Sequence, residues 1–146
     1  MRISILLLLV VTFISSMRGA EVVQTLPVGA GPHRSVITPD GTKAYLAERD
    51  SNRVTVVDLS VFPREIIRSV PVGLSPCGIA IDPAGEKVYV ANRVSGTISI
   101  IETAGDTASA PVSVGRLPCD LQIDPAGRYA YFGVEGEYEF RRLDLQ

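Results

Sequence analysis

The stretch "SPCGIAIDPAGEKVYVAN", residues 75–92, determines which fold the sequence favours. Its first part alternates apolar residues with others at Ile79 and Ile81, and a period of two predicts a short strand with one buried face. Residues 82–85 are a predicted tight turn, because proline presets φ, aspartate bonds back to the backbone and glycine closes the turn. The run "KVYVAN" then predicts a second strand, so the stretch as a whole predicts a β-hairpin.

The same pattern occurs three times along the chain. Residues 28–58, 72–102 and 114–144 align without gaps, and each copy carries a Pro-x-Gly turn followed by a strand with a tyrosine at one position. Those tyrosines, which we expect in the core between repeats, are Tyr45, Tyr89 and Tyr131. Three matching copies predict three copies of one structural unit.

Each unit is predicted to add further strands to the hairpin. A third strand is expected at residues 54–58 and 98–102, and a fourth at 66–72 and 110–114. Four short antiparallel strands in a unit of roughly 40 residues are typical of a propeller blade. We therefore predict an all-β chain of about three four-stranded antiparallel propeller blades, with copies that start near residues 28, 72 and 114.

The residues resemble one family of repeats in particular. The segments "SPCGIAI", "KVYVAN" and "TISIIE" and the Pro-x-Gly turn are similar to the YVTN-type β-propeller repeats of secreted and surface-layer proteins, which are related to the lactonase-like seven-bladed propellers. The resemblance covers residues 28–146 and implies the fold, whereas one fold hosts many activities. The third copy departs from the pattern after Gly133, so its third strand is less regular.

The N-terminus has a different character from the repeats. Arg2 is followed by an apolar run at residues 3–14 and then by small residues, which is typical of a secretory signal peptide. We predict a signal at residues 1–20 and a repeat domain at 21–146, and hence a secreted, periplasmic or cell-surface protein with no membrane span after the signal is removed. An uncleaved anchor is the alternative interpretation.

The charge and the ends of the chain bear on its partners. The net charge of −2 gives no basic surface for nucleic acid. Residues 21–28 match the fourth-strand position of a preceding blade, and this is the strand that the third copy lacks. The chain is therefore expected to be a partial propeller, or half of a dimeric six-bladed one in which residues 22–28 of one copy pair beside 140–145 of the other.

Three residues occupy one repeat position at the start of the first strand. His33, Cys77 and Cys119 each follow a proline, and the first strand of a blade is innermost, so we expect the three to ring one mouth of the central channel. Zinc or copper is one alternative for this set. A disulfide between Cys77 and Cys119 is a second, and free or packed thiols are the third. No cofactor is expected beyond that metal.

Two arginines also share a repeat position. Arg49 and Arg93 are candidates for binding an anion, with solvated loop charges as the alternative. No residue is predicted to be catalytic, because a single histidine and no acid-base cluster are weak grounds for an enzyme. The leading interpretation is a non-enzymatic module that binds a protein or small ligand through its funnel or loop face. The alternative is a lactonase-like hydrolase in which His33 and funnel acids assist water, with or without a metal.

Export can be tested directly. Expression with a C-terminal tag is expected to give a mature protein that is shorter by roughly 16 to 20 residues, because signal peptidase cleaves after the small residues that follow the apolar run. Intact-mass measurement of the purified protein checks this. Full-length protein in the soluble cytosol would contradict the prediction.

Overall fold

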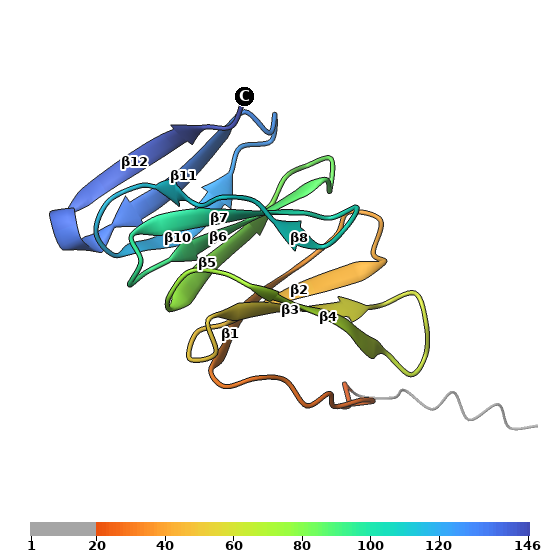
Figure 1. Ribbon diagram of the computed structural model, residues 1–146. Helices are drawn as coiled ribbons and strands as arrows, with labels where there is room; N and C mark the ends of the chain where they lie inside the picture. Colours follow the sequence, from red (N-terminus) through yellow and green to blue (C-terminus); the bar gives the residue numbers. More distant parts are fainter. Residues whose placement is uncertain (1–19) are drawn as a thin grey trace, which may run out of the picture.

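The computed structural model describes residues 20–146, which form three antiparallel sheets, one for each repeat (Figure 1). Blade 1 comprises β1 (Pro32–Ile37), β2 (Lys43–Glu48), β3 (Arg53–Asp58) and β4 (Glu65–Pro71). Blade 2 comprises β5 (Pro76–Ile81), β6 (Lys87–Asn92), β7 (Thr97–Glu102), β8 (Thr107–Ala108) and β9 (Val112–Ser113). Blade 3 comprises β10 (Pro118–Ile123), β11 (Tyr129–Val134) and β12 (Glu139–Asp144), with the 3-10 helix η1 (Glu135–Glu137). The predicted all-β partial propeller is thereby confirmed.

The outer strand of blade 2 differs from the prediction. A single fourth strand was expected at residues 110–114, but β8 and β9 each pair with a different part of β7. Pro111 lies between the two short strands and has no backbone N–H to donate to the ladder. The fourth strand is therefore broken into two pieces.

Blade 3 is more regular than its sequence suggests. All six residues of β12 pair in register with β11, from Tyr129 opposite Asp144 to Val134 opposite Glu139. The connection between the two strands is η1, and it ends at Tyr138 with a left-handed φ of 56°. The third copy thus loses the sequence pattern after Gly133 but keeps the strand.

The segment before blade 1 forms no strand in the described part of the chain. Residues 21–29 run in an extended course to β1, and Gln24 is fixed by two hydrogen bonds with the backbone of Arg64, each 2.8 Å long. Within residues 20–146, β12 pairs with β11 alone. Pairing of residues 22–28 with the β12 edge of a second copy stays a prediction, and residues 1–19 with the predicted signal lie outside the described residues.

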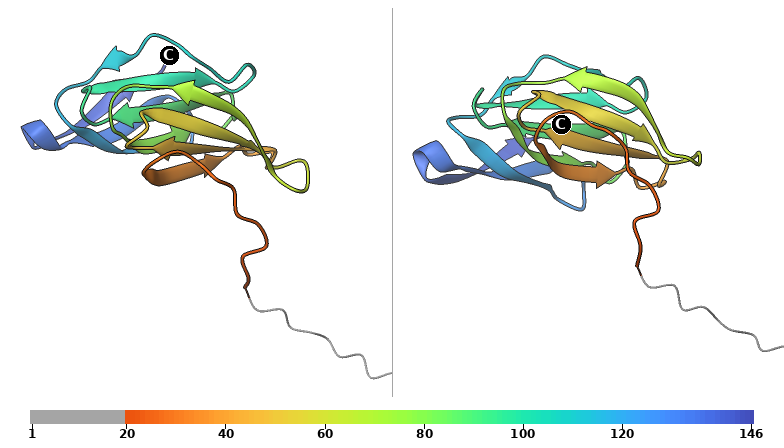
Figure 2. Two further views of the ribbon diagram at one scale, coloured as in Figure 1. Left: turned by 60° about the horizontal axis from the view of Figure 1, so that its bottom comes forward. Right: turned by 90° about the horizontal axis from the view of Figure 1, so that it is seen from below.

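The sheets stack face to face, and the cores lie between them (Figure 2). Along β6, Val88 and Val90 pack into the core shared with blade 1, whereas Tyr89 and Ala91 pack into the core shared with blade 3. Successive side chains of a strand point to opposite faces, so a central strand serves two cores at once. Tyr45 and Tyr89 are buried as predicted. The same prediction was wrong for Tyr131, which is only half-buried because no sheet of the described residues covers that face of blade 3.

A polar cluster joins blades 1 and 2 at the edge of their shared core. Asp106, in the turn between β7 and β8, accepts hydrogen bonds from the Tyr45 hydroxyl at 2.5 Å and from Lys43 Nζ at 2.8 Å. The Asp106 side chain is 8% exposed. Burial, followed by the bond to Asp106, raises the pKa of Tyr45 far above its ordinary value. The tyrosine therefore remains a neutral donor to a buried carboxylate.

The Pro-x-Gly turns also make contacts between blades. Gly85 has a φ of 74°, and a Cβ placed on it would lie 2.8 Å from Cδ of Pro39 in the turn of blade 1. Gly127 meets Pro83 of blade 2 in the same way. The glycine closes its own turn and leaves room for the proline of the preceding blade.

Valine substitutions at three glycines distinguish the cost of the positive φ from the cost of the clash with a neighbouring blade. Gly85→Val combines a strained φ with a clash and is expected to cost about 1–3 kcal/mol of unfolding free energy. Gly41 has a φ of 73° but no atom within 4 Å of a built Cβ, so Gly41→Val should cost less. Gly105→Val should cost least, because the nearest atom is 3.7 Å away and no positive φ is required. Urea denaturation measures all three, and equal costs would contradict the turn assignment.

The polar cluster has a matched control within the repeat. Lys43 and Lys87 occupy equivalent positions, and Lys87 pairs with the exposed Glu102 at 3.7 Å. Asp106→Ala is expected to lower the unfolding free energy by about 1–3 kcal/mol, because the buried Tyr45 hydroxyl and the partly buried Lys43 ammonium lose their acceptor. Glu102→Ala should cost about 0–1 kcal/mol. Denaturant titration of both variants checks this, and a similar loss in both would show that the cluster does not join the blades.

Candidate functional site

The chain turns sharply before each inner strand. The residues before β1, β5 and β10, which are Gly31, Ser75 and Leu117, occupy equivalent repeat positions and have φ values of 68°, 56° and 57°. The pairing register of β1 shifts between Pro32 and Arg34, and that of β5 shifts between Pro76 and Gly78. His33 and Cys77 are therefore the extra residues of β-bulges, and bulges redirect side chains.

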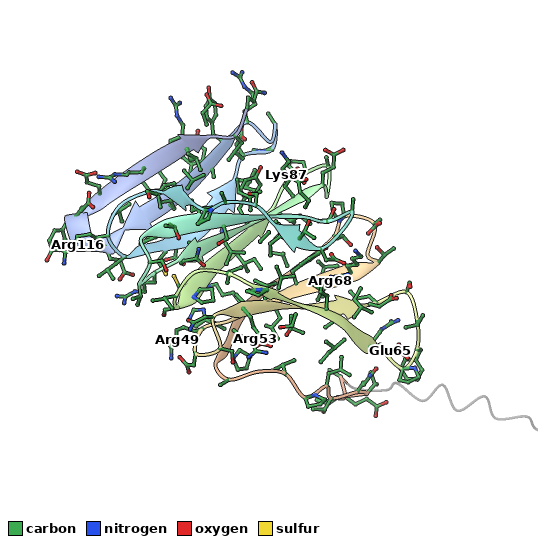
Figure 3. All side chains as sticks on the ribbon, in the orientation of Figure 1. Arg49, Arg53, Glu65, Arg68, Lys87 and Arg116 are labelled. Carbon is green, nitrogen blue, oxygen red and sulfur yellow. The ribbon has the colours of Figure 1, made fainter. Side chains whose placement is uncertain are left out.

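These side chains meet around one cavity at the start of the inner strands. It has a volume of about 370 Å³, and we call it the funnel-mouth cavity. Its lining residues are His33, Arg49, Asp50, Ser75, Cys77, Arg93 and Cys119. All five residues that the sequence nominated for a site are among them. Arg49 and its neighbour Arg53 project from the end of blade 1 that carries the turn between β2 and β3 (Figure 3).

Both arginines of the cavity are held by acids. Arg93 Nη2 lies 2.7 Å from Glu135 Oε2 of blade 3, and this hydrogen bond raises the pKa of Arg93. Arg49 Nε lies 3.2 Å from Oδ1 of Asp50 in its own turn. A guanidinium has five donor hydrogens, so each arginine keeps donors for a ligand. Glu135 occupies the repeat position of the two arginines in blade 3 and escaped the sequence analysis.

The two cysteines are free thiols with different exposure. Cys77 is 2% exposed, whereas Cys119 is half-buried. The Cys77 thiol donates a hydrogen bond to the carbonyl oxygen of Pro118, with Sγ and O 3.2 Å apart. Burial, and then the neighbouring Cys119 thiol, raise the pKa of Cys77 to about 12. Cys77 is therefore a neutral thiol at physiological pH.

The metal alternative finds no geometric support. Among residues 20–146, no three histidine, cysteine, aspartate or glutamate side chains are grouped closely enough to hold a metal ion. His33, Cys77 and Cys119 come from the inner strands of three adjacent blades. Zinc ligands must each approach to about 2.0–2.3 Å. The predicted trio lines one cavity, and a metal ion bound there stays a prediction.

A second cavity of about 550 Å³ lies along the inner strands β1, β5 and β10. Arg34 and Asp120 occupy equivalent positions in blades 1 and 3, and Arg34 Nη2 lies 2.5 Å from Asp120 Oδ1. The equivalent residue of blade 2 is Gly78, which has no side chain to obstruct the pair. The sequence analysis missed this charge pair, although alignment of the three copies places both residues in one column.

A buried acid also escaped the sequence analysis. The Glu48 side chain is fully buried, and its Oε1 accepts hydrogen bonds from Gly29 N at 2.9 Å and from Thr55 Oγ1 at 2.6 Å. Its Oε2 lies 3.6 Å from Arg53 Nε and has no hydrogen bond within the described residues. The equivalent residue of blade 2, Asn92, is buried in the same way. Alignment of the copies could have indicated this acid, because it places Glu48 opposite an asparagine in the second copy.

Comparison with known proteins places the chain in a family. A model of the family described as "Lactonase, 7-bladed beta-propeller" matches residues 15–137, most of the chain. The chain belongs to this lactonase family. The resemblance seen in the sequence is thereby confirmed for the propeller family, while the YVTN type of repeat stays an interpretation. No curated protein matches the chain.

Solved structures similar to this member of the lactonase family share its fold. Hydrazine synthase of Kuenenia stuttgartiensis is 24% identical with a TM-score of 0.74, over 87% of this chain and 36% of that one. The periplasmic gluconolactonase PpgL of Pseudomonas aeruginosa is 21% identical with a TM-score of 0.68, over 82% and 37%. A Bacteroides fragilis protein assigned as a 6-phosphogluconolactonase is 19% identical with a TM-score of 0.75, over 84% and 37%.

These similarities show a shared fold and do not identify an activity. The chain spans 36% to 37% of the length of those three structures. The names of the three cover more than one activity, in keeping with a fold that hosts many functions. Activity must therefore be argued from the funnel-mouth cavity itself.

Proposed function

We propose that this protein is a lactonase-like hydrolase that opens small sugar lactones in the funnel-mouth cavity. The observation that carries the proposal is the convergence of a histidine and two arginines on one cavity, in a chain of the lactonase family. This interpretation replaces the non-enzymatic binding module as the leading one, because the family and the two lactonase-named neighbours favour it. The three blades form one sector of the funnel.

The cavity offers the groups that lactone opening requires. Attack of water on the lactone carbonyl places negative charge on its oxygen, and a guanidinium aimed at that oxygen stabilises the charge. Arg93 is the better candidate of the two arginines, since the Glu135 carboxylate holds its side chain in place from the neighbouring blade. His33 is exposed and lines the same cavity, and imidazole is the usual base near neutral pH.

The proposed location is outside the cytoplasm. The predicted signal at residues 1–20 and the periplasmic gluconolactonase among the structural neighbours support an exported repeat domain at 21–146. In the described residues, no helix has the length and hydrophobicity to cross a membrane. An exported lactonase would meet small sugar lactones that diffuse in from the medium.

Hydrolysis of gluconolactone and of 6-phosphogluconolactone tests the proposal, with proton release recorded by a pH indicator. We expect turnover by the wild type, a fall in kcat/KM of about 100-fold for Arg93→Met, and a fall of about 100-fold for His33→Gln. Arg68→Met is the control, because Arg68 lies on the outer strand β4, away from the cavity. Melting curves confirm that each variant is folded.

The outcomes separate the two interpretations of function. Wild-type turnover that survives both cavity substitutions would place the reaction elsewhere on the molecule. If the wild type binds lactone without any turnover, and Arg93→Met loses that affinity, the hydrolase interpretation is wrong. The non-enzymatic binding module then becomes the leading interpretation again.

A further inference from the structure

We propose that Cys77 and Cys119 form an oxidisable pair that closes to a disulfide linking blades 2 and 3 at the funnel-mouth cavity. Both thiols are reduced in the structure, and both line that cavity. The pair is a modification site of the propeller itself, and it stands whether or not the cavity hydrolyses lactones.

The backbones of the two inner strands approach closely at this point. A Cβ built on Gly78, the residue after Cys77, would lie 3.0 Å from the amide nitrogen of Leu121 and 3.2 Å from that of Asp120. The absence of a side chain at residue 78 therefore lets β10 approach β5 beside the two cysteines. A disulfide requires Cα atoms within about 7 Å, and the close approach of β5 and β10 at this point favours such a spacing.

The Cys77 sulfur is directed toward the partner cysteine's own segment. It donates to the carbonyl oxygen of Pro118, the residue directly before Cys119, across the interface between the blades. The neighbouring Cys119 thiol is also the second cause of the raised pKa of Cys77, after burial. The hydrogen bond to Pro118 thus places the sulfur beside the segment that carries Cys119.

Unequal exposure gives the two thiols different roles in the reaction. A small organic disulfide reaches Cys119 from the cavity, and the Cys119 thiolate attacks one of its sulfur atoms. The S–S bond of the reagent breaks, one small thiol leaves with a proton, and a mixed disulfide forms on Cys119. Cys77 then loses its proton, its sulfur attacks the Cys119 sulfur, and a second small thiol leaves. Two protein thiols are oxidised, and one reagent disulfide is reduced to two thiols.

Only one intramolecular disulfide is possible in this chain. The chain has two cysteines, and the equivalent position of blade 1 is His33. The bond would remove both thiols from the cavity and add a covalent link between two blades that already share the Arg93–Glu135 pair. A covalent link between residues that are far apart in the sequence lowers the conformational entropy of the unfolded chain. The oxidised form should therefore be more stable.

Oxidised glutathione and the purified wild-type protein provide the test. The expected product has lost the mass of two hydrogen atoms, and trypsin without reductant releases residues 69–87 joined to 117–128. Its melting temperature is expected to rise by on the order of 5 °C. Dithiothreitol should reverse both changes. Oxidation that stops at a glutathione adduct on Cys119, or that joins two chains instead, would overturn the proposal.

Single cysteine variants distinguish the two thiols. Cys77→Ser should leave Cys119 with one bound glutathione and no further change. Cys119→Ser should leave Cys77 unmodified in the folded protein and available to iodoacetamide only after unfolding, because Cys77 is buried. Equal reactivity of both thiols in the folded state would contradict the assigned order of attack. If Cys77→Ser does not fold, Cys77→Ala gives the same readout, and the wild-type peptide map decides the existence of the bond without any variant.

Discussion

Stacking of one sheet on the next is the interaction on which the structure depends. The central strand β6 places Val88 and Val90 against blade 1 and Tyr89 and Ala91 against blade 3, so neither face is complete alone. Complete burial of a large apolar side chain contributes about 1.5–3 kcal/mol. Most of that contribution is available only once a neighbouring blade is present. Each repeat therefore relies on its neighbours, as expected for units that cannot bury their own hydrophobic faces.

The same constraint explains the exposed apolar residues at the free faces. Tyr131 occupies the position of Tyr45 and Tyr89, but it is half-exposed on the outer face of blade 3 and stacks on Phe140 with ring centroids 5.9 Å apart. Phe140 itself is 74% exposed. These are side chains whose equivalents are buried wherever another sheet covers them. A further sheet stacked on this face would bury them, and a fourth strand would pair the β12 edge.

Local rules made most of the fold predictable from the sequence. Period-two alternation and the Pro-x-Gly turns located the hairpin of the first two strands in each blade. In the structure, Asp82 and Asp124 accept backbone hydrogen bonds within their turns as that pattern requires. The broken fourth strand of blade 2 was mispredicted, because the effect of Pro111 was not weighed against the repeat pattern. Residues 21–28 were assigned to a strand by the same pattern, but a strand needs a partner, and pattern alone does not supply one.

The site could be predicted only in part, for a related reason. Repeat register was enough to bring His33, Cys77 and Cys119 to one mouth, because equivalent positions of stacked blades lie on the same rim. The pairs that cross between blades, such as Arg93 with Glu135, depend on how far the blades are twisted and separated. That spacing is set by tertiary packing and leaves no signature in one repeat read alone.

Comparison of the three copies shows where the propeller is free to vary. The turn glycine keeps its left-handed φ in all three copies, because closing its own turn requires that conformation. Positions on the funnel rim change in charge, because solvent and not a sheet lies above them: the column with Arg49 and Arg93 becomes Glu135 in blade 3. The sign change neutralises the rim between blades 2 and 3, whereas Arg49 has only the acid of its own turn. The repeat thus supplies a fixed scaffold, and substitutions on its rim give each sector of the funnel its own polarity.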